Sequence, residues 1–211
     1  MFASLTLEPD MKRLFDLLLV FAIATLLLPL LLGLPIAIGR NSRGAVLFRQ
    51  QRIGRGARPF QLLKFRTMVN ASSDAAGQFD AGSVARVTRA GRFLRRTKLD
   101  ELPQLWNVLK GDMSIVGPRP EVLKWTKVYP ERWAVVHTVR PGLTDPASIK
   151  FRNEEDLLRK AADPEAYYRD VILPEKLRLA EEYVATRSFF GDIVIMVQTA
   201  AAIVGVGTRS K

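Results

Sequence analysis

A run of 22 uncharged residues, 17–38, is the strongest hydrophobic pattern in the chain. As one continuous helix it would be about 33 Å long at about 1.5 Å per residue, which is enough to cross the hydrocarbon core of a bilayer. The run is apolar on every side, unlike the surface helix of a soluble fold. It is also longer than the apolar region of a typical cleavable signal peptide. The pattern therefore predicts a membrane-embedded segment.

Two prolines in this run, Pro29 near its middle and Pro35, predict a bend, because each removes a backbone hydrogen bond. A bent segment can enter and leave the same leaflet, but a single kinked transmembrane helix fits the composition equally well. Basic residues flank both ends of the run: Lys12, Arg13, Arg40, Arg43 and Arg49. They pull both ends toward the cytoplasm, and the residues alone leave the two arrangements open.

The remaining chain shows the patterns of an α+β protein that is mainly helical. Residues 45–65 hold two strand-like runs, VLFRQQRI and PFQLLKF, with Gly54 and Gly56 between them, which predicts a β-hairpin. Residues 70–83 have the composition of a loop. The sequence RPGLT at 140–144 places Pro before Gly, as a type II turn prefers.

Four helices are expected after this turn. Residues 154–162 and 164–171 form polar helices, the second capped by Asp163, and a third begins at Pro174. Residues 189–206 are apolar apart from Asp192 and Gln198, whose polar groups would be costly at bilayer depth. This last helix is therefore expected to pack on the core or to lie in the membrane interface.

The candidate chemistry lies in the sequence KLDELPQLWNVLKGDMSIVGPRP at 98–120. Four apolar residues share one face of a predicted helix: Leu102, Leu105, Trp106 and Leu109. Pro103 suits the first turn, so Asp100 and Glu101 lie at the positive end of the helix dipole, where neither should be easily protonated. Such a pair can cap the helix, hold a divalent cation or attack an electrophile.

Cationic residues around the pair favour chemistry over simple capping. Six basic residues precede or adjoin it: Arg86, Arg89, Arg92, Arg95, Arg96 and Lys98. Downstream, the stiff sequence GPRP presents Arg119. Arginine matches phosphate oxygens and a cation bridges carboxylate to phosphate, so these residues predict a metal and phosphate site.

The composition limits the partners. A net charge of +11 over 211 residues indicates an anionic partner, which can be nucleic acid, a phospholipid surface or a phosphorylated substrate. The apolar run favours the membrane. The chain has no cysteine, which excludes disulfides and thiolate metal sites.

Three motifs together resemble one family: KFRTM at 64–68, FLRRTKLDELPQLWNVLKGDMSIVGPRP at 93–120 and RPGLT at 140–144. With the proline-containing apolar segment, they resemble the bacterial sugar transferases, the small monotopic phosphoglycosyl transferases that initiate capsule, exopolysaccharide, O-antigen and N-linked glycan assembly. The resemblance runs from about residue 12 to residue 190. It implies transfer of a sugar phosphate from a UDP-sugar to polyprenyl (undecaprenyl) phosphate, with release of UMP.

The resemblance also implies roles for single residues. Asp100 is the expected nucleophile, which forms a phosphosugar-aspartyl intermediate, and Glu101 helps to position Mg²⁺ and manage protons. The expected phosphate and nucleotide contacts are Lys64, Arg66, Arg95, Arg119 and Arg140. Mg²⁺ is the expected cofactor, held by Asp100 and Glu101.

For the fold, the resemblance favours a re-entrant helix-break-helix with both ends cytoplasmic, a small β-hairpin and amphipathic interface helices. It divides the chain into a tail (1–11), a re-entrant membrane helix (12–39) and an interface-associated catalytic domain (40–211). The expected location is the cytoplasmic face of the bacterial inner membrane. Expected partners are membrane lipids and downstream glycosyltransferases but no nucleic acid, and the sugar, the pathway and the oligomeric state stay open.

The chain departs from the family pattern at two places. Many members have Ser before the helix-breaking proline, but here Leu28 precedes Pro29, so the break is expected to rest on Thr25 or Pro35. An acidic residue shortly before a Tyr-Val pair has no match in register near Tyr183, so Glu181 and Glu182 receive no role. The alternative function is a non-enzymatic, membrane-anchored basic module that binds anionic lipid or nucleic acid.

Overall fold

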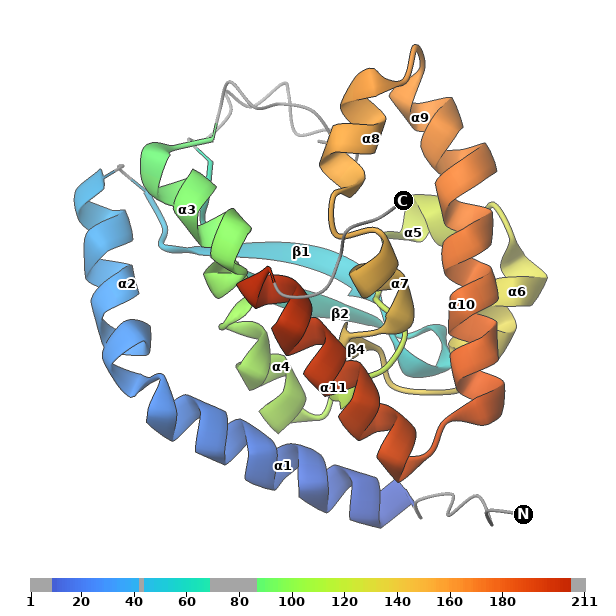
Figure 1. Ribbon diagram of the computed structural model, residues 1–211, viewed down its shortest axis with the longest axis horizontal. Helices are drawn as coiled ribbons and strands as arrows, with labels where there is room; N and C mark the ends of the chain where they lie inside the picture. Colours follow the sequence, from blue (N-terminus) through green and yellow to red (C-terminus); the bar gives the residue numbers. More distant parts are fainter. Residues whose placement is uncertain (1–8, 42–43, 69–86, 206–211) are drawn as a thin grey trace.

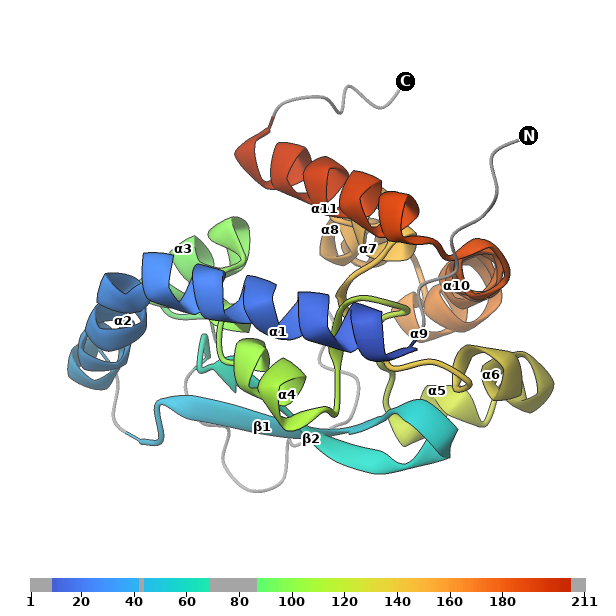
Figure 2. The same ribbon diagram turned by 90° about the horizontal axis from the view of Figure 1, so that it is seen from below.

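The computed structural model describes residues 9–41, 44–68 and 87–205 of the chain. The loop expected at 70–83 and Arg86 of the basic cluster lie outside these residues. Helices dominate, with one antiparallel and one parallel pair of short strands. The β1–β2 hairpin and helix α11 lie on opposite sides of the molecule, with α1 and α4 between them (Figure 2).

The apolar segment forms two helices, α1 (Pro9–Leu26) and α2 (Leu28–Asn41), which are bent by 64° relative to each other (Figure 1). The bend confirms the prediction from Pro29, but the expectation that the break rests on Thr25 or Pro35 is wrong. It lies at Leu27, and Pro35 is inside α2. No single helix of the described residues is long and apolar enough to cross a membrane, whereas the bent pair together meets both criteria.

Helix α1 has an inner and an outer face, although its sequence is apolar nearly all round. Asp16 and Val20 are buried, and α1 packs against α4 and β3. Met11, Leu14 and Leu18 lie on the outer face with 59–63% of their surface exposed. The protein therefore covers one face of this helix and leaves the other to its surroundings.

The predicted hairpin is confirmed. Strand β1 (Leu47–Ile53) pairs antiparallel with β2 (Pro59–Phe65), and the short 3₁₀ turn η1 (Arg55–Ala57) joins them. Gly56 has φ of 66°, a left-handed conformation that favours glycine. The Asn107 side chain fastens the hairpin to α4, since it accepts from Leu63 N (3.0 Å) and donates to the carbonyl of Gln61 (2.7 Å).

A parallel pair was not predicted. Strand β3 (Ser114–Val116) pairs with β4 (Gly142–Thr144), so the second half of the RPGLT sequence is a strand and the expected type II turn is wrong there. The two backbones approach so closely that a Cβ on Gly142 would lie 2.1 Å from the Gly117 nitrogen. Glycine is therefore required at this position. No local sequence pattern predicts the pairing.

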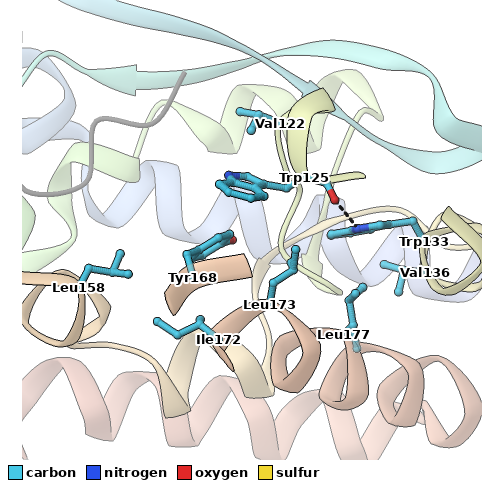
Figure 3. Packing of buried hydrophobic residues seen from close by; sticks show 10 residues of the cluster. Val122, Trp125, Trp133, Val136, Leu158, Tyr168, Ile172, Leu173 and Leu177 are labelled. Carbon is cyan, nitrogen blue, oxygen red and sulfur yellow. Dashed lines mark hydrogen bonds between the residues drawn. The ribbon is translucent and has the colours of Figure 1, made fainter. Parts of the chain in front are cut away.

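The helices of the central and C-terminal chain surround these strands. Before and after the parallel pair they are α3 (Arg89–Thr97), the 3₁₀ turn η4 (Leu99–Glu101), α4 (Gln104–Lys110), α5 (Leu123–Thr126), α6 (Pro130–Val136), α7 (Pro146–Lys150), α8 (Glu154–Lys160), α9 (Pro164–Tyr167), the π-helical turn η5 (Tyr168–Ile172), α10 (Leu173–Thr186) and α11 (Phe189–Val204). Trp125, Trp133 and Tyr168 form the centre of a core between α5, α6 and α10, where Trp133 Nε1 donates to the Trp125 carbonyl at 3.0 Å (Figure 3).

Two expectations for the helices need correction. The helix expected at 164–171 does not end there, because η5 continues it into α10. Pro174 lacks the N–H that would bond to Asp170, and the π-helical turn lies directly before it. The Asp163 cap is confirmed, since its carboxylate accepts from two backbone N–H groups of α9 at 3.0 Å.

The expected apolar face of the helix after Asp100 is also only partly right. Helix α4 begins at Gln104, with Pro103 just before it. Leu105 is buried, but Trp106 and Leu109 are 61% and 41% exposed. Two polar residues of α4, Gln104 and Asn107, are buried instead, and Asn107 bonds to the backbone of β2.

Candidate active site

The acidic pair lies in η4, the short turn between α3 and α4. Helix α3 ends at Lys98, which adopts a left-handed conformation (φ 59°) and donates its N–H to the Arg95 carbonyl at 3.3 Å. This sharp ending turns the chain inward, and Pro103 stops η4 from merging with α4. Asp100 and Glu101 are therefore presented on a rigid corner rather than in the first turn of a long helix.

Glu101 is clamped by two cations. Its Oε1 accepts from Lys64 Nζ at 3.0 Å and from Arg119 at 2.6 Å, while Oε2 lies 3.3 Å from the second Arg119 nitrogen. Burial alone would raise the pKa of Glu101, but Arg119 and Lys64 outweigh it and hold that pKa well below its usual range. Burial lowers the pKa of Lys64, against the attraction of Glu101. Glu101 is thus ionised and fully engaged.

Asp100 is in a different state. It is 7% exposed, and its buried Oδ1 has no hydrogen-bond partner among the described residues. Burial raises the pKa of Asp100, and Lys64 is the strongest influence that opposes the shift. Desolvation at Asp100 thus acts against the helix dipole that was expected to keep both carboxylates ionised. Asp100 combines a free oxygen with a basic carboxylate.

Arg119 is positioned at the carboxyl end of the parallel strands β3 and β4. It follows β3, and its backbone N–H donates to the Asp145 carboxylate at 3.2 Å. Asp145 follows β4, is 2% exposed, and also accepts from Ser148 N at 2.8 Å at the start of α7. The analysis of the sequence missed Asp145, although Asp before Pro146 is a signature of a helix N-terminus that could have located it.

Further cations lie around the pair. Arg95 donates from Nε to Thr67 Oγ1 at 3.0 Å and pairs with Glu155 at 3.1 Å, and its charge lowers the pKa of Asp100, as does that of Lys98. Arg66 is buried directly before Thr67, and its backbone N–H donates to Val46 O at 2.8 Å. Lys64, Arg95 and Arg119 therefore gather at Asp100 and Glu101 as expected. Lys98 and Thr67 join them without having been assigned a role.

Arg140 lies with different residues. It precedes β4, whereas Asp145 follows it, and a three-residue strand spans about 10 Å. The Arg140 Nε donates to the Gly111 carbonyl at 3.1 Å, and the side chain lines a separate cavity that also includes Lys12 and Asp16. The structure thus does not bring Arg140 to the acidic pair.

The residues present are compatible with Mg²⁺ at this site. Magnesium is usually held by one or two carboxylates together with substrate phosphates, rather than by a cage of protein ligands. The described residues contain no group of three or more His, Cys, Asp or Glu suited to a metal, but the buried, unpartnered Oδ1 of Asp100 is an open ligand. Glu101 is the second carboxylate, although Lys64 and Arg119 already occupy it.

A buried carboxylate with a free oxygen, surrounded by lysine and arginine, suits nucleophilic attack on a phosphate. In a comparison with known proteins, the profile of the family described as "Bacterial sugar transferase" matches residues 7–206. The chain belongs to the bacterial sugar transferase family. The match includes the bent helix pair and every residue of the candidate site, so this sugar transferase resembles its family across nearly all of its length.

Curated relatives of this sugar transferase carry names that state an activity. It is 37% identical over 193 residues to the UDP-glucose:undecaprenyl-phosphate glucose-1-phosphate transferase of Escherichia coli (strain K12), a match that covers 90% of this chain and 39% of that protein. A protein of the same name from Caulobacter vibrioides is 37% identical over 91% of this chain and 69% of its own length. An Aeromonas hydrophila UDP-N-acetylgalactosamine-undecaprenyl-phosphate N-acetylgalactosaminephosphotransferase is 37% identical over 74% of this chain and 38% of its own.

The chain thus spans about two fifths of the length of the Escherichia coli and Aeromonas relatives that it matches. The relatives' names also differ in the sugar, glucose in one case and N-acetylgalactosamine in another. Family membership is therefore compatible with more than one donor.

Proposed function

We propose that this protein transfers a sugar phosphate from a UDP-sugar to undecaprenyl phosphate, the first step in assembly of a cell-surface glycan, and that Asp100 is the nucleophile. The names of the relatives support the donor and acceptor classes. The observation that carries the proposal is the state of Asp100, a buried carboxylate with an oxygen that no described residue engages.

The two chemical steps follow from that carboxylate. An Asp100 oxygen attacks the β-phosphorus of the UDP-sugar, the bond from that phosphorus to the bridging oxygen breaks, and UMP leaves with the bridging oxygen. An oxygen of the lipid phosphate then attacks the same phosphorus, the bond to Asp100 breaks, and the carboxylate is regenerated with the polyprenyl diphosphate sugar as product. A covalent intermediate divides one difficult displacement into two easier ones.

The neighbouring residues prepare the site. Lys64 and Arg119 reduce the negative charge that an attacking carboxylate meets at a diphosphate, and Glu101 holds both of them in place. The low pKa of Glu101 makes it a weak base, which favours this positioning role over proton transfer. Asp100 and Glu101 are the residues that would hold Mg²⁺, which when bound neutralises phosphate charge.

A membrane location fits the lipid acceptor. The outer face of α1, most of α2 and the outer face of α11 expose apolar side chains, and the bent pair has the length and composition of a re-entrant segment. In the proposed arrangement the protein is monotopic on the cytoplasmic face of the inner membrane. An acceptor phosphate at the interface then reaches Asp100 without leaving the bilayer.

The Asp100→Asn variant tests the proposal. Detergent-solubilised protein is incubated with a panel of UDP-sugars, Mg²⁺ and undecaprenyl phosphate, and UMP release is measured. The variant should lose activity by at least about 1,000-fold, because the amide is not a nucleophile. Asp170→Asn is the control, since Asp170 is exposed and pairs only with its neighbour Arg169 on the surface, and it should retain activity within about twofold.

Two further measurements sharpen this test. Mass spectrometry of protein quenched with its donor should show a phosphosugar on residue 100, and chelation should abolish UMP release. Full activity of Asp100→Asn would refute the nucleophile. Absence of UMP release from every donor, together with lipid or nucleic acid binding that chelation does not alter, would favour the basic-module alternative.

A further inference from the structure

A second cationic cavity lies away from Asp100, at the amino-terminal edge of the parallel strand pair. It is found where α1 begins and where α10 passes into α11, segments that lie side by side in both views (Figures 1 and 2). Its volume is about 150 Å³, a size that in other proteins accommodates a molecule as large as benzene. The proposed reaction makes no use of this cavity.

The acidic groups in the cavity wall are already engaged by the protein. Asp192 pairs with Lys12 and accepts from the Tyr183 hydroxyl at 2.9 Å. Asp16 accepts from Ser114 Oγ at 2.8 Å and from Ile115 N at 3.2 Å. These contacts hold the wall together, and Asp192 is already paired with a cation.

Three arginines remain on the same cavity: Arg55 from η1, Arg140 before β4 and Arg187 before α11. The described residues supply no hydrogen bond or ion pair to the side chains of Arg55 and Arg187. Arg140 uses Nε for the Gly111 carbonyl at 3.1 Å, which leaves its terminal nitrogens directed elsewhere. Burial lowers the pKa of Arg140, and the charges of Arg13 and Arg55 lower it further, against the attraction of Asp16.

The two helices that line the cavity, α1 and α11, expose apolar side chains on their outer faces. Lys12 and Asp16 face inward from α1, and Met11 and Leu14 beside them are 60% and 59% exposed. On α11, Phe190 near Asp192 is 65% exposed. A cationic cavity between two helices that have exposed apolar faces matches an amphiphile with an anionic head.

We propose that this cavity binds a phosphate group at a site separate from Asp100, and that Arg55, Arg140 and Arg187 donate to its oxygens. Guanidinium groups match phosphate oxygens in paired hydrogen bonds. The same chemistry is offered by the headgroup of a phospholipid and by free phosphate, and the exposed apolar faces of α1 and α11 favour the phospholipid. A lipid held at this point would anchor the start of α1 and of α11 to the membrane surface.

The test uses the full chain in a non-ionic detergent and isothermal titration calorimetry. The probes are dihexanoyl phosphatidylglycerol, inorganic phosphate, and dihexanoylglycerol, which has the same chains but no phosphate. The double variant Arg55→Gln and Arg187→Gln should bind the phospholipid at least about tenfold more weakly than the unaltered protein. The described residues form no hydrogen bond or ion pair with these two side chains, so the substitutions break no such pair, and circular dichroism verifies the fold.

Two controls separate this site from general charge and from the acidic pair. The variant Arg169→Gln with Arg178→Gln loses the same charge from an exposed surface and should bind within about twofold of the unaltered protein. The variant Arg119→Gln, which removes a cation beside Glu101, should also bind the phospholipid within about twofold of the unaltered protein.

The outcomes are distinct. Weaker phospholipid binding in the Arg55 and Arg187 double variant alone supports the proposal with a lipid source. Inorganic phosphate that binds as tightly as the phospholipid, and is lost in the same variant, supports the phosphate site but overturns the lipid source. Unchanged binding in the double variant, or equal binding of dihexanoylglycerol, overturns the site.

Discussion

Asp100 and Glu101 are adjacent residues with opposite electrostatic environments. Glu101 receives hydrogen bonds from Lys64 and Arg119, which keep it ionised, whereas the buried Oδ1 of Asp100 receives none from the described residues. Two carboxylates with pKa values pushed apart are suited to different tasks. One organises the cations, and the other is available to react.

The raised pKa of Asp100 predicts how activity changes with pH. In the proposed mechanism only the carboxylate attacks, so activity should fall as the pH drops through this pKa. Lys64 is the strongest influence that lowers it. Lys64→Gln should therefore raise the pKa of Asp100 and move the acid limb of the kcat/KM profile to higher pH.

Two controls accompany the profile of Lys64→Gln. Lys98→Gln should shift the limb in the same direction but less, because its effect on Asp100 is smaller. Lys150→Gln, whose partner is Glu175 on the surface, should leave the limb in place. An acid limb of the kcat/KM profile that is unchanged or moves to lower pH in Lys64→Gln would contradict its assignment to Asp100.

The raised pKa of Asp100 also affects the free energy of unfolding, which should fall with rising pH, whereas activity should rise. A carboxyl group whose folded-state pKa is raised stabilises the fold only at low pH, and that contribution is lost as the pH rises through the folded-state pKa. At neutral pH the buried charge of Asp100 therefore costs stability. Asp100→Asn should melt no lower than the unaltered protein at neutral pH, which a thermal unfolding curve followed by circular dichroism checks.

The parallel strand pair is the element that relates the two cationic regions. Arg119 follows β3 and bonds to Glu101, whereas Arg140 precedes β4 and lines the second cavity. The pair also contacts α1 and α11, through the bonds of Asp16 to Ser114 and Ile115 and of Thr144 to Thr199. Two strands of three residues each thus connect the candidate site around Asp100 and Glu101 to the helices proposed to contact the membrane.

Gly142→Ala should disrupt this element. The new Cβ would lie 2.1 Å from Gly117 N and 2.3 Å from Gly117 O, so the strands must separate. We expect a loss of about 3 kcal/mol in the free energy of unfolding and loss of UMP release, because Arg119 is displaced. Thermal unfolding in detergent and the UMP assay measure both effects.

Gly39→Ala is the matched control for this substitution. A Cβ at Gly39 meets nothing within 4 Å, and alanine favours the helical conformation of α2. This variant should be as stable as the unaltered protein or more so. Equal behaviour of the two variants would show that the close approach of Gly117 and Gly142 does not matter.

Among the described residues, apolar exposure is concentrated on one set of helices. The exposed large hydrophobic residues of α1, α2 and α11 are Met11, Leu14, Leu18, Phe21, Leu26, Leu28, Leu30, Leu32, Ile36, Phe190, Val194, Val197 and Ile203. Together with the 64° bend, this distribution supports a hairpin that enters and leaves one leaflet.

Cysteine labelling tests that topology. The chain has no cysteine, so single cysteines at Ser4 and Ser42, which flank the bent pair, are unique reporters. In spheroplasts, a membrane-impermeant maleimide should label neither position until the membrane is opened. Labelling of one position from outside would establish a spanning helix and refute the re-entrant arrangement.

The sequence by itself determined the membrane-length apolar run, its bend near Pro29, the β-hairpin and the order of acidic and basic residues that marks the family. These features depend on neighbours along the chain, through periodicity, proline and turn chemistry. The tertiary structure alone decided that Glu101 is clamped while Asp100 is left open, that Gly142 pairs with Ser114, and that Arg140 belongs to a second cavity. Burial and charge pairing depend on residues far apart in the sequence, and no local pattern contains that information.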